Sequence, residues 1–93
     1  MDMQKRLESQ VSGRVQMVMF RDFVTRKARV LGIVGTVRNN PDGTVSVVAE
    51  GEESKLRDLV ALLEKGSTLS RVDLVTEKWS EPLGGYKNFD ILY

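Results

Sequence analysis

Apolar and polar residues alternate at the start of the chain and then change to a helical spacing. In residues 7–12 one side carries Leu7, Ser9 and Val11 and the other carries Glu8, Gln10 and Ser12. This period of two is typical of a half-buried strand. Further on, an apolar stripe at helical spacing consists of Phe20, Phe23, Val24, Ala28 and Leu31. A helix is therefore predicted to begin near residue 20 and, because Gly32 suits a C-terminal cap, to end near residue 31.

The middle of the chain predicts a hairpin and a second helix. Residues 33–39 are rich in β-branched side chains and alternate, and residues 45–50 alternate again. Residues 40–43 (NPDG) separate them and have the composition of a turn, which predicts a β-hairpin. Residues 51–53 (GEE) then open a helix with the acidic charge that a helix N-terminus favours, and Gly66 ends it. The apolar stripe of this helix consists of Leu56, Leu59, Val60 and Leu63.

The last third of the chain predicts two more strands. Residues 71–79 are strand-like although apolar residues fall on both sides, residues 81–88 form a loop, and residues 89–93 alternate as a short terminal strand. The order β-α-β-β-α-β with an added C-terminal strand predicts a ferredoxin-like α+β sandwich, in which two helices cover one face of an antiparallel sheet. At 93 residues, the chain is expected to form a single domain, 1–93. Four aromatic residues are expected to pack in the core or at sheet edges: Trp79, Tyr86, Phe89 and Tyr93.

The composition removes several kinds of chemistry. The chain has no cysteine and no histidine. Disulfides, thiol nucleophiles, Ser-His triads and the usual transition-metal ligands are thereby excluded. Any reaction must rely on Arg, Lys, carboxylates, amides, hydroxyls or the backbone.

The length of the apolar runs and the net charge bear on location and partners. The longest apolar run covers five residues, 59–63, whereas a membrane-spanning helix needs about 20, so no membrane span is expected. The N-terminal sequence MDMQKRLESQ is charged where a secretory signal is apolar, which makes the cytoplasm the expected location. The net charge of +1 argues against a nucleic acid as partner.

Residues 13–21 (GRVQMVMFR) connect the first strand to the first helix and form the candidate site. Such a turn directs backbone N–H groups and the positive end of the helix dipole at one point, which favours an anion. Arg21 adds a guanidinium suited to phosphate or carboxylate, although a lone arginine is also commonly a solvated surface charge. The turn lacks GxxxxGK[ST] and GxGxxG, so ATP and NAD are disfavoured. Residues 1–39 hold eight Lys and Arg against three Asp and Glu, which is consistent with attraction of a small anion.

Asn39 ends the second predicted strand, directly before the turn at 40–43. An asparagine in that place commonly serves only the turn. In a ferredoxin-like fold the second strand is able to run close to the mouth of the first turn, where an amide can hold a water. Both interpretations of Asn39 stay open at this point.

Two motifs resemble the signatures of the acylphosphatases. Residues 13–21, GRVQMVMFR, resemble GxVQGVxFR, and residues 35–39, GTVRN, resemble the second signature, GxVxN, at the expected distance. The segments PDGTVSVVAEG (41–51) and YKNFDILY (86–93) are similar to the family as well. The likeness covers nearly everything after the first few residues.

The resemblance implies hydrolysis of the carboxyl-phosphate anhydride of small acyl phosphates, to a carboxylate and inorganic phosphate, without metal or cofactor. It assigns phosphoryl binding to Arg21 and orientation of the attacking water to Asn39. It adds to the phosphate site the loop amides of Val15, Gln16, Met17, Val18, Met19 and Phe20. Positioning and charge stabilisation suit a chain without histidine or cysteine. A monomer is expected.

Met17 departs from the family signature, which has glycine at that position. If that position has a positive φ, methionine there costs about 1 to 3 kcal/mol or forces another loop path. The first hypothesis is therefore an acylphosphatase whose activity Met17 reduces, and the alternative is a noncatalytic phosphate-binding module. A third hypothesis, an RNA-binding sheet, is disfavoured because the third strand (SVVAEG) carries no aromatic residue.

Overall fold

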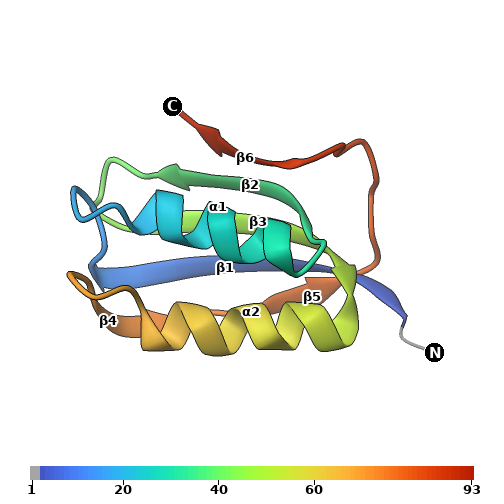
Figure 1. The fold of residues 1–93 in the computed structure, drawn as a ribbon, viewed down its shortest axis with the longest axis horizontal. Helices are drawn as coiled ribbons and strands as arrows, with labels where there is room; N and C mark the ends of the chain where they lie inside the picture. Colours follow the sequence, from blue (N-terminus) through green and yellow to red (C-terminus); the bar gives the residue numbers. More distant parts are fainter. Residues whose placement is uncertain (1–2) are drawn as a thin grey trace.

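The computed structural model describes residues 3–93 and consists of a six-stranded sheet with two helices packed on one face (Figure 1). The elements along the chain are β1 (Gln4–Arg14), α1 (Phe20–Val30), β2 (Val34–Asn39), β3 (Val45–Glu52), α2 (Glu53–Lys65), β4 (Arg71–Val75), β5 (Lys78–Ser80) and β6 (Phe89–Leu92). This arrangement confirms the predicted ferredoxin-like α+β fold with an added C-terminal strand. Among residues 3–93 no helix is long and apolar enough to cross a membrane.

The strand order in the sheet is β4-β1-β3-β2-β6, and β5 also pairs with β1. All pairs are antiparallel except β2 with β6, which is parallel, so the sheet is mixed. The loop at 81–88 crosses one end of the sheet from the β5 edge to the β2 edge (Figure 1). Because the chain crosses at that end, β6 runs in the same direction as β2 and brings the C-terminus back toward the start of α1.

The segment predicted as one strand, residues 71–79, is divided into β4 and β5. Both pair with β1, and the pairing of β4 with β1 shifts between Ser12 and Gly13, where Asp73 is an extra residue on β4. At the break, Thr76 Oγ1 accepts a hydrogen bond from the Gln10 N–H at 2.9 Å and the Thr76 N–H donates to the Gln10 carbonyl at 3.0 Å. The extra residue in β4 places both Val72 and Val75 against the core, which explains why the apolar residues of the segment did not keep to a regular alternation.

The helix ends follow the predicted glycines. Leu31 is the C-cap of α1, with Gly32 beyond it at φ 72°, and Gly66 is the C-cap of α2. The start of α2 differs slightly from the prediction, because residues 51 and 52 belong to β3 and the helix begins at Glu53. Gly51 pairs with Lys5 and Glu52 with Gln4 on β1.

The core lies between the helices and the covered face of the sheet. Phe89 is buried and Trp79 packs against the core, as predicted, and the half-buried Tyr86 accepts a hydrogen bond from Arg6 at 3.5 Å. The prediction for Tyr93 is wrong, because its side chain is fully exposed. Pairing of β6 with β2 ends at Leu92, so no neighbouring strand covers Tyr93.

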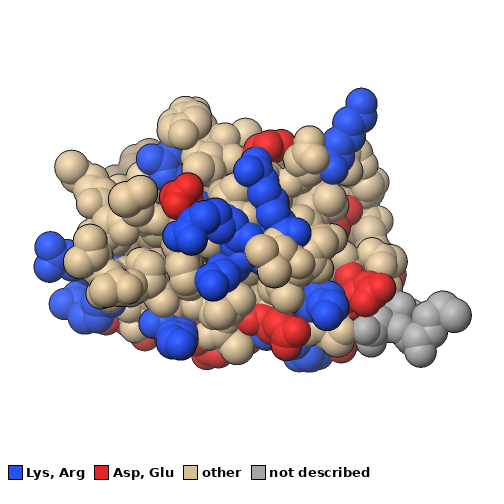
Figure 2. All heavy atoms as spheres, in the orientation of Figure 1, with Lys and Arg blue, Asp and Glu red and all other residues tan. Residues whose placement is uncertain are grey.

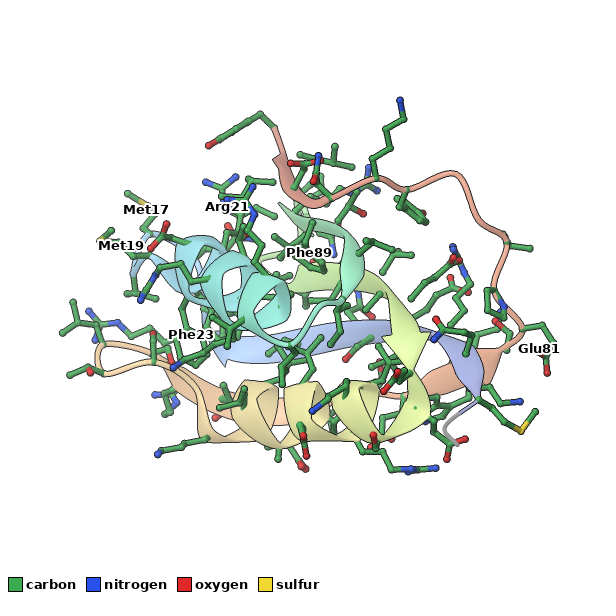
Figure 3. All side chains as sticks on the ribbon, turned by 45° about the vertical axis from the view of Figure 1, so that its right-hand side comes forward. Met17, Met19, Arg21, Phe23, Glu81 and Phe89 are labelled. Atoms are coloured by element: carbon green, nitrogen blue, oxygen red, sulfur yellow. The ribbon has the colours of Figure 1, made fainter. Side chains whose placement is uncertain are left out.

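A buried ion pair holds the loop that leads to β6. Glu50, on β3, accepts hydrogen bonds from Arg6 Nη1 at 2.8 Å and from the N–H groups of Leu83 at 3.0 Å and Gly84 at 3.1 Å. Burial alone would raise the pKa of Glu50, but these hydrogen bonds and the positive charge of Arg6 outweigh it and hold the pKa below its usual value. The loop is thus fixed at the end of the molecule opposite to the residues described next (Figure 3).

Candidate active site

Arg21 and Asn39, which come from different elements, line one pocket of about 480 Å³. The pocket lies where β1 leads into α1, beside the end of β2 and the end of the chain. Its lining consists of Val15, Met17, Met19, Phe20, Arg21, Asp22, Asn39, Ile91 and Tyr93. Figure 3 shows Met17, Met19 and Arg21 together at the start of α1. The fold therefore brings together the two residues to which the family resemblance assigned complementary roles.

The loop between β1 and α1 has an unusual backbone. Met17 and Met19 both have a φ of 60°, and they are the non-glycine residues with positive φ in the described part of the chain. A left-handed conformation costs an L-residue about 1 to 2 kcal/mol. Met17 is 99% exposed and Met19 73% exposed. Two residues of the loop are thus left-handed. One of them, Met17, stands at a position where glycine would be relaxed, and the Met17 side chain lies outside the core.

Apolar contacts hold the loop in this conformation. Val15 and Phe20, at its two ends, are each 1% exposed and belong to the hydrophobic core. Val18, between the two methionines, packs against the same core. Burial of these three side chains stabilises the loop and offsets the backbone strain.

The first turn of α1 offers free hydrogen-bond donors to the pocket. Met19, the N-cap residue, makes no side-chain capping hydrogen bond. The first N–H groups of a helix have no partner within the helix, and here they belong to residues 20–22, which line the pocket. These groups carry the positive end of the helix dipole. An anion is the natural ligand of such a site.

Arg21 is the cation of the pocket that remains available to a ligand. Its guanidinium carbon lies 5.1 Å from the centre of the Tyr93 ring, a cation–π contact. In the described part of the chain, Arg21 forms no ion pair, whereas the neighbouring Asp22 pairs with Arg26 at 3.0 Å. In the view of Figure 2, basic side chains gather over α1, which carries Arg21, Arg26, Lys27 and Arg29. The surroundings of the pocket therefore attract anions.

Asn39 contributes a buried acceptor. Its backbone pairs with Val45 at the end of β2, and its side-chain Oδ1 is buried without a hydrogen-bond partner among residues 3–93. An unsatisfied buried polar atom costs about 1 to 3 kcal/mol. Because Asn39 also lines the pocket, a donor bound in the pocket is a candidate partner for this oxygen.

Gln16 has a role that the sequence did not reveal. Its Nε2 donates to the carbonyl oxygens of Asn40 and Thr44, each at 2.9 Å. Of the residues predicted for the phosphate site, Gln16 and Val18 do not line the pocket, and the others do. The contribution expected of the loop residues 15–20 is the backbone N–H. The one amide side chain in an otherwise apolar run, VQMVMF, was the available signal.

The turn that Gln16 contacts has its own polar network. Asn40 Nδ2 donates to Thr44 Oγ1 at 2.9 Å and to Ser46 Oγ at 2.7 Å. Asp42 accepts from the Thr44 hydroxyl at 2.6 Å and from its N–H at 3.0 Å, and these bonds lower the pKa of Asp42. The turn directly after Asn39 is thus well ordered and bound to the loop before α1.

Comparison with known proteins gives consistent matches. The family model for acylphosphatase matches residues 7–91. The chain is 43% identical to an acylphosphatase of Caldanaerobacter subterraneus, over 96% of this chain and 99% of that one. It is 45% identical to an acylphosphatase of Thermococcus kodakarensis, over 88% and 92%. The crystal structure of acylphosphatase from Bacillus subtilis superimposes with a TM-score of 0.93 and 37% identity, covering 96% of this chain and 99% of the other.

Proposed function

The chain belongs to the acylphosphatase family, and we propose that it hydrolyses acyl phosphates to a carboxylate and inorganic phosphate, with residues 1–93 acting as a single domain. The observation that carries this proposal is the pocket shared by the unpaired Arg21 guanidinium and the unpartnered Asn39 Oδ1, at the uncapped start of α1. One group suits a phosphoryl oxygen and the other suits a water.

In the proposed complex the phosphoryl group lies in the loop before α1. Backbone N–H groups of residues 15–20 donate to its oxygens, as does the planar guanidinium of Arg21, which is able to bind two oxygens at once. These donors are fixed before the substrate arrives because Val15 and Phe20 anchor the loop in the core. Preorganised donors of this kind stabilise the charge that shifts on the phosphoryl oxygens in the transition state.

Asn39 Oδ1 accepts a hydrogen bond from the water and turns a water lone pair toward phosphorus. The water oxygen bonds to phosphorus while the bond from phosphorus to the carboxyl oxygen breaks, and the carboxylate leaves with the bonding electrons. The proton of the water passes to an oxygen of the transferred phosphoryl group. Because a carboxylate is a good leaving group, positioning supplies much of the catalysis and no strong protein base is required.

Met17 supports a second candidate, a weakened or noncatalytic phosphate-binding module. Its φ of 60° meets the condition under which methionine at this position costs about 1 to 3 kcal/mol. Its side chain is exposed and the loop is held by the core on both sides. We therefore propose that Met17 lowers the stability of the fold and the rate of hydrolysis, but does not occupy the phosphate site in the loop before α1. Shifts of the loop signals with phosphate in NMR spectra, without turnover, would favour the module instead.

The proposal is tested with benzoyl phosphate, whose hydrolysis is followed by ultraviolet absorbance. Arg21→Ala and Asn39→Ala are each expected to lower kcat/KM by about 10²- to 10³-fold. Arg38→Ala and Asn88→Ala remove the same side-chain types outside the pocket and are expected to keep the activity. If Arg21→Ala and Asn39→Ala turn over like the unchanged protein, the assigned roles are wrong. We also propose that the protein is a cytoplasmic monomer and has no nucleic-acid partner. This test does not bear on those points.

A further inference from the structure

The mouth of the pocket is rimmed by exposed apolar side chains. Met17 is 99% exposed, Met19 73% and Tyr93 100%, and all three line the pocket that holds Arg21. Isolated apolar residues on a protein surface need no explanation. Here three such side chains line one pocket with Arg21, where they are placed to contact whatever is attached to a phosphate bound there. We call Met17, Met19 and Tyr93 the rim.

The backbone holds the two methionines outside the core. Both are in the left-handed conformation while their neighbours Val18 and Phe20 pack inward. Neighbouring residues therefore leave both methionine side chains largely uncovered, Met17 at 99% and Met19 at 73% exposure. Methionine has a flexible, polarizable side chain that adapts to apolar ligands of irregular shape. The rim is thus free to fold over a ligand that occupies the pocket.

Tyr93 places an aromatic ring beside the proposed phosphate ligand. Arg21 contacts the ring at 5.1 Å, yet the Tyr93 side chain is otherwise open to solvent. Aromatic rings attract other rings in offset or edge-to-face contacts, worth about 0.5 to 1.5 kcal/mol beyond the area that they bury. A planar group attached to a phosphate bound at Arg21 would therefore contact the Tyr93 ring.

Within the pocket lining, as distinct from the basic surface of α1 around it, the charges favour a ligand with one anionic group. The Arg21 guanidinium is occupied by the phosphoryl group in the proposed complex. The other charged residue in the lining is Asp22, whose carboxylate forms an ion pair with Arg26 at 3.0 Å. A second carboxylate on the acyl group would meet Asp22 and the apolar rim, with no free cation in the lining to receive it.

We propose that the rim of Met17, Met19 and Tyr93 binds the acyl part of the substrate and selects acyl phosphates with a neutral aromatic or aliphatic acyl group. The proposal rests on the proposed function, since it places the phosphoryl end of the substrate on Arg21. It adds the chemical class of the other end. The rim is open to solvent, so its preference is moderate rather than absolute.

The binding test uses two ligands that lack the hydrolysable anhydride, phenylphosphonate and methylphosphonate. Their Kd values are measured by NMR from the methionine methyl and loop amide signals. Phenylphosphonate is expected to bind about 3- to 10-fold more tightly, as the partial burial of one ring predicts. The Met17→Asn/Met19→Asn variant removes the apolar side chains but keeps a residue type that tolerates positive φ. It is expected to abolish most of this preference, whereas Leu83→Asn, at an exposed leucine outside the pocket, preserves it.

The kinetic test compares benzoyl phosphate with acetyl phosphate. The ratio of their kcat/KM values is expected to fall about 3- to 10-fold in Met17→Asn/Met19→Asn and in Tyr93→Ser. Equal losses on both substrates, with equal Kd values for the two phosphonates, would overturn the rim while leaving the proposed hydrolysis intact. A preference for phenylphosphonate that the double variant removes, in a chain that hydrolyses neither acyl phosphate, would support the rim and overturn the proposed reaction.

Discussion

The side-chain Nε2 of Gln16 donates to the carbonyl oxygen of Asn40 at 2.9 Å, and this bond joins the loop before α1 to the turn after β2. Asn39, the residue before Asn40, is the last residue of β2. The proposed phosphate donors and the proposed water acceptor therefore belong to two segments whose relative position Gln16 fixes. Its second bond, to the Thr44 carbonyl, restrains the loop from the other side of the turn.

We predict that Gln16→Leu lowers both activity and stability. The change leaves the Asn40 and Thr44 carbonyls without this donor, which is expected to cost about 1 to 3 kcal/mol in urea unfolding. A small displacement of the loop from Asn39 is expected to lower kcat/KM about 10- to 100-fold. Gln10→Leu is the matched control, because the Gln10 amide donates to the Thr44 side chain and does not contact the loop. Equal activity of the two variants would show that Gln16 does not position the site.

The elements whose pattern lies within a single segment were predicted from the sequence. Each helix has its own apolar stripe and its own terminal glycine, so its position does not depend on the rest of the chain. The hairpin of β2 and β3 is likewise specified by its turn composition. The same holds for the candidate loop, which is a local motif between a strand and a helix.

What the sequence did not predict depends on partners far along the chain. The mixed sides of residues 71–79 follow from a register shift between β1 and β4, and the exposure of Tyr93 follows from where β6 stops pairing with β2. The Glu50 contacts join residues more than thirty positions apart. The hydrogen bonds of Gln16 cross to another turn. The spacing of apolar residues within one segment does not predict contacts of this kind.

Glu50→Gln is predicted to destabilise the fold at neutral pH. It removes the charge that faces Arg6, whose side chain is 13% exposed, and loss of one partner of a buried pair costs about 3 kcal/mol. Urea unfolding at pH 7 measures this loss. The control is Glu8→Gln, whose carboxylate is 41% exposed and 3.5 Å from Arg6, and which is expected to cost less than about 1 kcal/mol.

The effect of Glu50 is predicted to depend on pH. Because the pKa of Glu50 is lower in the folded protein than in the unfolded chain, its contribution is present above the unfolded pKa of about 4.3 and is lost as the pH falls through the folded value. The stability difference between the unchanged protein and Glu50→Gln should therefore narrow below pH 4. A difference that stays constant from pH 7 to pH 3 would contradict the lowered pKa.

Met17→Gly is predicted to stabilise the protein and raise its activity. Glycine relieves a left-handed strain of about 1 to 2 kcal/mol, but it also loses more entropy on folding, so the expected gain in unfolding free energy is about 0.5 to 1 kcal/mol. Val18→Gly is the control at the next position, where loss of an apolar contact with the core is expected to destabilise. Thermal unfolding and benzoyl phosphate turnover are measured on both. A less stable Met17→Gly would mean that the methionine side chain contributes more than its backbone costs.

Inorganic phosphate is predicted to stabilise the folded chain through Arg21. At ten times its Kd, a ligand that binds only the folded state adds about 1.4 kcal/mol, which raises the Tm of a domain of this size by roughly 6 to 11 °C. The shift is measured against chloride at equal ionic strength, so that general screening is the same in both samples. Arg21→Ala is expected to lose most of it. Arg38→Ala removes an exposed arginine next to Asn39 that does not line the pocket, and it is expected to keep the full shift. If both variants keep the shift, phosphate binds elsewhere, and the anion site at the start of α1 is wrong.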